Sequence, residues 1–353
     1  MVPAPPSRRA DVQQRADAGP ADGARRRPDA DPAAGGRRSV TASTLVVLNP
    51  ASAGGRTLKR WPEAAAELAA GGVEYELRLT TGPGDATEQV RDALAAGCRR
   101  IVAVGGDGTL NEVVNGFFDA DGEALGDSAT LGLIPSGTGG DFRKCAGVPA
   151  SAAAAARAVV SGSVRRIDAG RVDYDGAGRR FFINIADCGI GGEVVARVNR
   201  STRKRGGAGG SAVFLWESLR TLLSFGGRDA RIEVDGAVVE RTVRSVVVAN
   251  GRFFGGGMHI APEASLDDGL FDVVIVAASG RVAALSGLPA LYRGRHLSRR
   301  EVELRKGRVV RVESLGEPLL FDVEGEQVGQ TPATLTCLPG AIALCMPAAD
   351  EVR

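Results

Sequence analysis

The sequence predicts an α/β protein with an open α/β domain over residues 43–165 and a mainly antiparallel β domain over residues 166–348. Two observations support this division. In the first part, short apolar runs alternate with helical patterns, which is typical of a parallel sheet covered by helices. In the second part, valine-rich runs are separated by hairpin turns, which is typical of antiparallel strands. A length of 353 residues also fits two domains.

The first domain is predicted from four apolar runs, each followed by a helical pattern. The expected strands are residues 45–48, 73–79, 101–104 and 131–134. The expected helices are a segment carrying the apolar stripe of residues 61–69, then residues 86–96, 110–117 and 151–161. Because strand and helix alternate, these strands should form a parallel sheet whose ligands lie beyond the carboxyl ends of the strands.

The second domain is predicted from runs of β-branched and aromatic residues. These expected strands are residues 166–174, 181–187, 230–234, 243–250, 270–277, 301–313, 319–323 and 341–346. Asp175-Gly176 and Asp235-Gly236 are strong hairpin signals between neighbouring strands. Residues 191–223 interrupt the pattern, with one helix expected at residues 212–223.

Composition excludes several classes of protein. The 44 basic and 42 acidic residues give a net charge of +2, which argues against a dedicated nucleic-acid binder. Five scattered cysteines without a CxxC pair favour reduced thiols in a cytoplasmic protein, and two histidines make a zinc site an unfavourable interpretation. No apolar run approaches the ~18 residues that a membrane span needs.

Residues 1–42 differ from the rest in composition. They are rich in Pro, Arg, Ala, Asp and Gly without periodicity, and they carry 8 Arg and 5 Asp. We expect a disordered tail. A misassigned start codon and a basic arm that touches anionic lipid are the alternatives.

Residues 101–116, IVAVGGDGTLNEVVNG, contain the most informative motif. A buried strand runs into the glycine turn Gly105-Gly106-Asp107-Gly108-Thr109, and a helix follows that includes Asn111. Bare backbone N–H groups at a helix N-terminus bind phosphate, and an Asp in the turn can hold the Mg²⁺ that accompanies a nucleotide. An ordinary βα turn is the alternative, but it does not require this many glycines.

Two further polar loops follow parallel strands. One contains Asn49, Ser52 and Gly54; the other contains Gly137, Thr138 and Asp141. Since the carboxyl ends of parallel strands share one edge, the three loops should converge. Asp141 could alternatively cap the helix that follows it.

Acidic residues at three places in the second domain are candidates with open alternatives. Asp168 lies inside an apolar strand, where it could simply face solvent. Asp268, followed by Gly269 and Leu270, could form a tight turn or hold a hard cation. Glu324 and Glu326 flank Gly325, and they could form a surface hairpin or include a general base.

Together these motifs resemble the diacylglycerol kinase catalytic family, which includes bacterial soluble lipid kinases and sphingosine kinases. The resemblance covers residues 44–346. Its signature is the Gly105–Thr109 turn, a motif that NAD kinases and phosphofructokinases share. The blocks at Asn250-Gly251, Pro262-Glu263-Ala264 and Leu266–Gly269 favour the lipid-kinase branch.

The resemblance implies an NAD kinase-like N-terminal α/β domain, a C-terminal antiparallel β-sandwich and an active site between them. It also implies roles for individual residues. The ATP site would contain Asn49, Ser52, Gly54, Gly105, Gly106, Asp107, Gly108, Thr109, Asn111, Gly137 and Thr138. Asp107, Asp141 and Asp168 would form a carboxylate network around the catalytic Mg²⁺, and Asp268 with the Leu270 carbonyl would hold a structural metal. Glu324 would be the base, with Glu326 beside it.

The expected activity is an ATP- and Mg²⁺-dependent transfer of phosphate to a lipid hydroxyl, most simply that of diacylglycerol. The partner would be lipid at a membrane surface, met transiently by a cytoplasmic protein through the basic stretches 197–205 and 293–300 and the apolar residues 214–216. No nucleic-acid partner is expected, and a homodimer stays open.

Two positions depart from the family pattern. Gly140 stands where Asn is usual before Asp141, and Glu324 stands where Asp is usual. A longer side chain moves the carboxylate by about 1.5 Å, and misplacement of this size can reduce rate. The alternatives are therefore an NAD kinase-like enzyme with a soluble acceptor and a weakened, nucleotide-binding regulatory protein.

Overall fold

The computed structural model describes residues 43–126, 128–136, 140–176, 178–204 and 210–347, with the backbone alone at residues 202–204 and 210–212. The predicted tail at residues 1–42 lies outside this part of the chain, as do Gly137 and Thr138.

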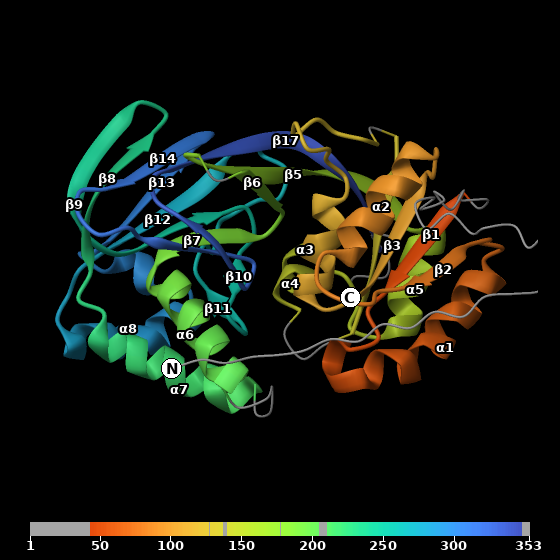
Figure 1. The fold of residues 1–353 in the computed structure, drawn as a ribbon, viewed down its shortest axis with the longest axis horizontal. Helices are drawn as coiled ribbons and strands as arrows, with labels where there is room; N and C mark the ends of the chain where they lie inside the picture. The colour runs from red at the N-terminus through yellow and green to blue at the C-terminus, as the bar shows by residue number, and fades with distance from the viewer. Residues whose placement is uncertain (1–42, 127, 137–139, 177, 205–209, 348–353) are drawn as a thin grey trace, which may run out of the picture. The chain divides into compact units, whose positions relative to one another are not determined.

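The N-terminal half contains the predicted parallel sheet (Figure 1). Its strand order is β2-β1-β3-β4, and all neighbouring strands are parallel. The strands are β1 (Thr44–Leu48), β2 (Glu76–Leu79), β3 (Arg100–Gly105) and β4 (Thr130–Pro135). The helices are η1 (Ser52–Gly55), α1 (Arg56–Ala70), α2 (Asp85–Ala95), α3 (Asp107–Asn115), α4 (Asp141–Ala146) and α5 (Ala152–Ser161).

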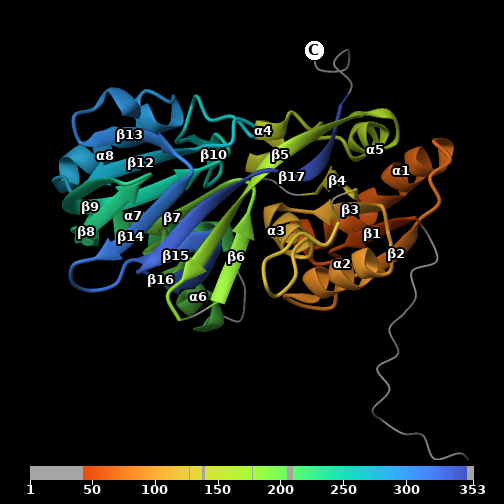
Figure 2. The same ribbon diagram turned by 90° about the horizontal axis from the view of Figure 1, so that it is seen from above.

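Helices cover both faces of this sheet, with α1 and α5 packed together on one face and α2 and α3 on the other (Figure 2). Burial on both faces explains why the central strands are continuous apolar runs. Every residue of β1 is buried, and so are residues 101–105 of β3. This half therefore folds around the sheet and leaves its carboxyl edge for polar loops.

The C-terminal half is antiparallel, as predicted. Its main path runs β16-β15-β7-β9-β8-β14-β17, while β12 joins β9 to β13. The strands are β6 (Gly178–Phe182), β7 (Ile185–Gly189), β8 (Arg228–Val234), β9 (Ala237–Ala249), β10 (Phe253–Phe254), β11 (Met258–His259), β12 (Phe271–Ala277), β13 (Val302–Gly307), β14 (Val309–Ser314), β15 (Leu320–Val323) and β16 (Glu326–Gln330).

Two long strands connect the halves. β17 (Ala333–Met346) pairs antiparallel with β5 (Ser163–Tyr174), and its C-terminal part also pairs parallel with β4. Beyond β5, the β5–β6 hairpin returns to the first half through the stacked rings of Phe181 and Phe118, whose centroids lie 3.9 Å apart. The hydrogen-bonded sheet is thus continuous across both halves.

The predicted hairpin at Asp235-Gly236 is confirmed. Both residues have positive φ, 48° and 85°, as a type I′ turn requires, and they join β8 to β9. Two expected strands were too long: residues 181–187 divide between β6 and β7, and residues 301–313 divide between β13 and β14. The expected strand at residues 341–346 was too short, because β17 begins at Ala333.

The helices of this half were the least predictable. Residues 191–223 contain two helices, α6 (Ile190–Lys204) and α7 (Gly210–Ser224), where one was expected. Helix α8 (Arg281–Tyr292) was not expected, because its sequence is apolar almost all round and shows no helical stripe. A short turn of helix, η2 (His296–Ser298), follows it. None of the helices in the described ranges has the length and apolar character to cross a membrane.

Candidate active site

The three polar loops converge at the carboxyl edge of the parallel sheet, as predicted. Asn49 Nδ2 donates to Thr109 Oγ1 at 3.0 Å, which joins the loop after β1 to the start of α3. Ser52 Oγ donates to the Ser136 carbonyl at 3.0 Å, which joins the same loop to the end of β4. At Gly105, a Cβ atom would lie 2.5 Å from Thr109 Oγ1, so this contact requires glycine.

Asp107 is the first residue of α3 and lies where the other two loops meet. Its Oδ2 accepts a hydrogen bond from the Asp141 backbone N–H at 3.2 Å. Burial raises the pKa of the Asp107 carboxyl, and the nearby Asp141 charge acts in the same direction. A carboxylate at a helix N-terminus, beside a second carboxylate, is a suitable place for a cation that accompanies phosphate.

Asp141 is buried and uses both carboxylate oxygens. Oδ1 pairs with Lys144 Nζ at 2.9 Å, and Oδ2 accepts from the Gly256 backbone N–H at 2.8 Å. The alternative of a helix cap is wrong, because the residue that precedes α4 is Gly140 and the Asp141 side chain turns away from the helix start. Gly140 has φ +57°, a left-handed conformation that glycine and asparagine both adopt readily. The Gly140 departure from the family pattern is therefore conformationally mild.

Glu324 lies in the turn between β15 and β16, with φ +54°. Its Oε1 accepts from the backbone N–H groups of Ile183 and Asn184, each at 2.7 Å. Its Oε2 accepts from Asn111 Nδ2 at 3.0 Å. Burial raises the pKa of Glu324 to about 7, and the charge of Asp107 contributes to the rise. The side chain is thus held in one position with a pKa suited to a base at neutral pH.

The position of Glu324 depends on how α3 contacts β6. Asn115 Oδ1 accepts from the Phe181 N–H at 3.0 Å, and its Nδ2 donates to the Phe181 carbonyl at 2.9 Å. Asn111 Nδ2 also donates to that carbonyl at 3.0 Å. Asn115 and Asn184 were not singled out from the sequence; Asn111 and Asn115 share one helix face at i, i+4, which was the available signal.

Beneath the Glu324 turn lies a second pair of carboxyl groups. Asp322 Oδ1 accepts from the Gly325 N–H at 2.7 Å and so supports the turn. Asp187 is opposite Asp322 in the β7–β15 register, and it is buried with Oδ1 unpartnered within the described residues. Burial raises the pKa of Asp322 to about 6, and burial beside Asp322 raises the pKa of Asp187 as well.

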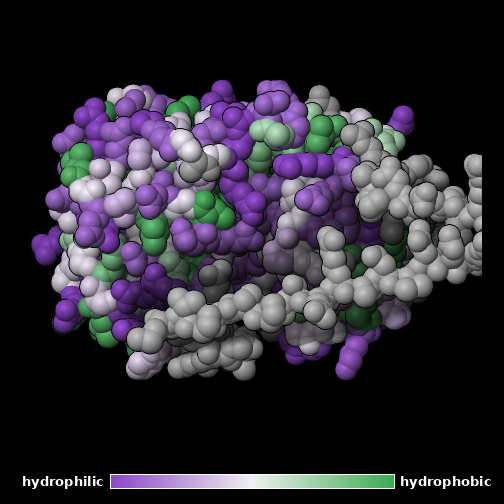
Figure 3. All heavy atoms as spheres, viewed as in Figure 1, coloured by the Kyte–Doolittle hydropathy of each residue, from purple (hydrophilic) through white to green (hydrophobic). Residues whose placement is uncertain are grey.

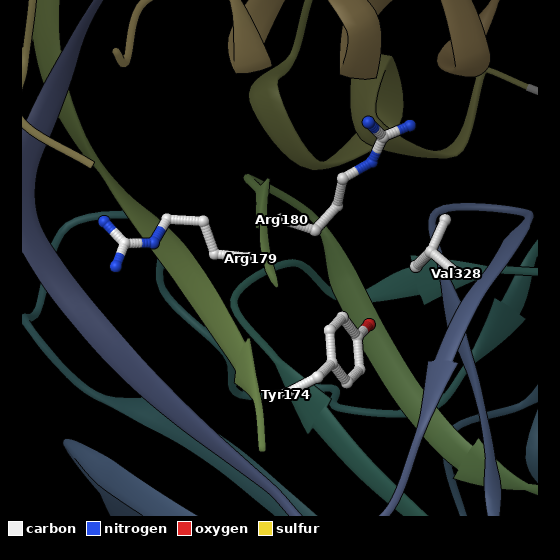
Figure 4. Close-up of a pocket in the computed structure, with 4 residues that line it drawn as sticks. All are labelled: Tyr174, Arg179, Arg180 and Val328. Atoms are coloured by element: carbon white, nitrogen blue, oxygen red, sulfur yellow. The ribbon is translucent and has the colours of Figure 1, made fainter. Parts of the chain in front are cut away.

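Glu326 lies at the edge of this region, where it pairs with Arg180. Arg180 lines a pocket of about 250 Å³ together with Tyr174, Arg179 and Val328 (Figure 4). The Tyr174 hydroxyl is buried without a hydrogen-bond partner within the described residues. Glu326 is therefore held by a guanidinium group beside this pocket, and none of the contacts described links it to Asp107 or Asn111.

Asp168 is placed in a different set of contacts. Its Oδ1 accepts from the Gly340 N–H and its Oδ2 from the Gly269 N–H, both at 2.7 Å. With 1% of its surface exposed, it does not face solvent, so that alternative is wrong. The structure brings Asp107 and Asp141 together, but Asp168 joins β5 to two glycine turns.

The Asp268 region already contains a cation of its own. Lys306 Nζ lies 3.4 Å from Asp268 Oδ2 and 3.2 Å from Asp272 Oδ2. Asp268 Oδ1 accepts from the Leu270 N–H at 3.1 Å. A metal held by Asp268 and the Leu270 carbonyl would have to share these carboxylates with the ammonium group, so the residues present fit it poorly. No three Asp, Glu, His or Cys side chains in the described ranges form a metal site.

Family models match most of the described chain. One, described as "Diacylglycerol kinase catalytic domain", matches residues 43–172. Another, described as "YegS C-terminal NAD kinase beta sandwich-like domain", matches residues 185–346. The boundary between the two matches falls within the β5–β6–β7 segment.

Curated relatives and solved structures cover the same region. A "Diacylglycerol kinase" of Bacillus subtilis (strain 168) is 29% identical, over 86% of this chain and 95% of the relative. A "Probable lipid kinase YegS-like" of Pseudomonas aeruginosa (strain PAO1) is 32% identical, over 87% and 95%. A crystal structure of a "putative diacylglycerol kinase from Bacillus anthracis str. Sterne" has a TM-score of 0.68 and 27% identity, over 86% of this chain and 96% of that chain.

Proposed function

The chain belongs to the diacylglycerol kinase catalytic-domain family of lipid kinases, and on that premise we propose that it transfers the γ-phosphoryl group of ATP to the hydroxyl group of diacylglycerol. The observation that carries this proposal is the placement of Glu324. Three hydrogen bonds hold its carboxylate at Asn111, on the helix whose first residue is Asp107.

In this proposal the loops of the first half bind the nucleotide phosphates. The N-terminus of α3, with its free backbone N–H groups and favourable dipole, faces the γ-phosphate. Asp107 would hold the Mg²⁺ that accompanies ATP, since Mg²⁺ in such sites needs one or two carboxylates in addition to phosphate oxygens and water. When bound, this ion neutralises charge on the transferring phosphoryl group.

Glu324 accepts the proton of the attacking lipid hydroxyl. A base works best when its pKa lies near the working pH, and the pKa of Glu324 lies at about 7. The proton moves from the lipid oxygen to a carboxylate oxygen as the oxygen–phosphorus bond forms, and ADP leaves with the electron pair of the broken bond.

The longer side chain at residue 324 supports a working base. Its length lets Oε1 reach two adjacent backbone N–H groups in the bend between β6 and β7 while Oε2 reaches Asn111. A carboxylate fixed by three donors is pre-organised, so the change from Asp to Glu need not weaken catalysis. This favours an enzyme over the nucleotide-binding regulatory protein.

The choice of a lipid acceptor rests on the relatives, several of which are named as diacylglycerol or lipid kinases. The test incubates the purified full chain with labelled ATP, Mg²⁺ and either diacylglycerol in mixed micelles or NAD. We expect label in phosphatidic acid. Label in phosphorylated NAD would establish the soluble-acceptor enzyme instead, and bound ATP with no labelled product would establish the regulatory protein.

A further inference from the structure

Helices α7 and α8 contact one another and together expose a concentration of apolar side chains. Of the fifteen large hydrophobic residues exposed in the described part of the chain, eight lie on these two helices. We call them the α7–α8 surface: Phe214, Leu215, Trp216, Leu219, Leu223, Val282, Leu285 and Tyr292. The most exposed are Val282 (82%), Leu215 (71%) and Trp216 (62%).

The exposed residues follow helical spacing. On α7, Leu215, Leu219 and Leu223 recur every four residues, and on α8 Val282, Leu285 and Tyr292 recur at spacings of three and seven. Each helix therefore presents apolar side chains along its exposed side. Figure 3 shows the face whose lower left edge includes α7 and α8; on it, hydrophobic residues are visible among mostly hydrophilic ones.

The surface is flanked by cations, and its two helices carry no exposed carboxylate among their described residues. Residues 279–300 contain no Asp or Glu, and Arg281, Arg293 and Arg295 are exposed. Within the described ranges these three guanidinium groups make no ion pair. The carboxylate on α7, Glu217, is buried and accepts a hydrogen bond from Ser201 Oγ at 2.7 Å.

The α7–α8 surface is attached to the antiparallel strands of the C-terminal half, which also carry Glu324. Buried Arg244 on β9 donates from Nη1 to the Leu222 carbonyl at 2.9 Å and from Nη2 to the Ser279 carbonyl at 2.7 Å, so one guanidinium holds the end of α7 and the approach to α8. Helix α6 packs so tightly on β15 that a Cβ on Gly192 would lie 2.1 Å from the Leu320 carbonyl oxygen.

We propose that the α7–α8 surface docks onto an anionic phospholipid bilayer and so brings the Glu324 hairpin to its lipid substrate. This inference rests on the proposed function, because it requires that the acceptor is a lipid that lies in a bilayer. Exposed apolar side chains bordered by arginines fit the interface between acyl chains and negatively charged headgroups. Of the two basic stretches expected to meet headgroups, residues 293–300 follow α8 and contribute to this surface. In the other, whose side chains are described only as far as residue 201, Arg197 is engaged by Glu193 and Ser224.

A second copy of this chain is the competing occupant. In a symmetric dimer the same surface would meet itself, which would bring the unpaired Arg281, Arg293 and Arg295 of both copies into one interface without a carboxylate to neutralise them. An anionic bilayer provides the opposite charge as well as an apolar layer, so it fits better.

Vesicle binding by the full chain tests the proposal. Binding is measured by co-sedimentation with phosphatidylcholine vesicles, with and without phosphatidylglycerol. The chain has two tryptophans, so a Trp61→Phe background makes Trp216 the reporter of insertion. We expect binding and a blue shift of Trp216 emission only with phosphatidylglycerol. Equal binding to neutral vesicles, or no shift of Trp216 emission on binding, would overturn the proposal.

Variants of exposed residues test the surface without disturbing the fold. Leu215→Ser with Val282→Ser should abolish the binding, while the matched control Leu315→Ser, an exposed leucine elsewhere, should leave it unchanged. Each Arg→Gln change at positions 281, 293 and 295 should weaken binding about fivefold, the equivalent of ~1 kcal/mol per basic residue. Equal losses in the Leu315→Ser control would contradict the assignment.

Kinase assays separate this inference from the proposed function. The Leu215→Ser, Val282→Ser variant should phosphorylate short-chain diacylglycerol in detergent micelles at the normal rate and lose activity on vesicles. If the unaltered chain phosphorylates no lipid in either form but still binds vesicles, the proposed function fails and the docking surface stands. If light scattering shows that the variant changes a dimer into a monomer while vesicle binding persists, the docking surface fails.

Discussion

Asp168, which is buried, and Glu324, which is half-buried, are two carboxylates that the same kind of contact holds in place. Each accepts two backbone hydrogen bonds of 2.7 Å, from Gly269 and Gly340 in one case and from Ile183 and Asn184 in the other. In both, burial raises the carboxyl pKa. They differ in what lies next to them.

Glu324 has a side-chain donor, Asn111 of α3, and the charge of Asp107, the first residue of α3, as neighbours. The Asp168 carboxylate is held by two glycine turns, and the charges that act on it are those of Asp267 and Asp268. A buried, fully hydrogen-bonded carboxylate is therefore not by itself a sign of catalysis. The groups that share its surroundings decide whether its chemistry can reach a substrate.

The largest expected effect is on catalysis by Glu324. Glu324→Gln should keep the backbone hydrogen bonds yet remove the base, and kcat should fall by ~10²–10⁴-fold. Steady-state kinetics with diacylglycerol micelles measure this, and thermal unfolding shows whether the variant is folded. Glu326→Gln, at the rim beside Arg180, is the control and should lose much less. If the Glu324→Gln enzyme had a near-normal kcat, Glu324 would not be the base, and its role would be structural like that of Asp168.

The next largest effect is expected in the pH dependence of kcat, which should follow the protonation of Glu324. Since only deprotonated Glu324 accepts a proton, kcat should rise about tenfold per pH unit below its pKa of about 7 and level off above it. Its raised pKa also means that the folded state binds the proton more tightly than the unfolded state. The associated stability is present below the unfolded pKa near 4.5 and is lost as pH rises to about 7.

Unfolding in urea at a series of pH values measures the second effect. Glu324→Gln should flatten the fall in stability between about pH 4.5 and 7. The slope that persists comes from the other carboxyl groups whose pKa values are raised, among them Asp107, Asp168, Asp187 and Asp322. An unchanged slope in the variant would mean that Glu324 titrates normally.

A smaller effect, on stability and not on chemistry, is expected at Asp168. Asp168→Asn places an NH₂ group against the N–H of either Gly269 or Gly340. Because that buried donor then lacks an acceptor, the free energy of unfolding should fall by about 1–3 kcal/mol. Denaturant unfolding should show this loss, while kcat per folded molecule should stay within a few-fold of normal. If kcat falls as far as in Glu324→Gln, Asp168 belongs to the catalytic carboxylates after all.

The smallest effect is expected at Asp268, where Lys306 supplies the positive charge. The Lys306–Asp268 pair is largely solvent-accessible, so Asp268→Asn should change stability by only ~0–1 kcal/mol. EDTA should leave the melting temperature of the unaltered chain the same. A metal-dependent melting temperature that Asp268→Asn abolishes would restore the structural metal implied by the family resemblance.

Much of the first half was predictable because its signals are local. Apolar runs such as residues 101–104 and the glycine turn after them specify a strand and a βα loop over a few residues. Parallel strands then place the loops of Asn49, Asp107 and Asp141 at one edge of the sheet, and this placement does not depend on the second half of the chain. Helix α8 was missed because a helix that exposes apolar residues lacks the stripe on which prediction relies.

By itself, the sequence determined the α/β and antiparallel β regions, the converging glycine loops and the family to which they belong. Only the tertiary structure decided which carboxylates meet. Asn111 and Glu324 are 213 residues apart, and their hydrogen bond depends on the docking of α3 against β6 and on the β7–β15 register. Such long-range contacts have no local sequence signal, because they arise from packing between elements that fold for independent reasons.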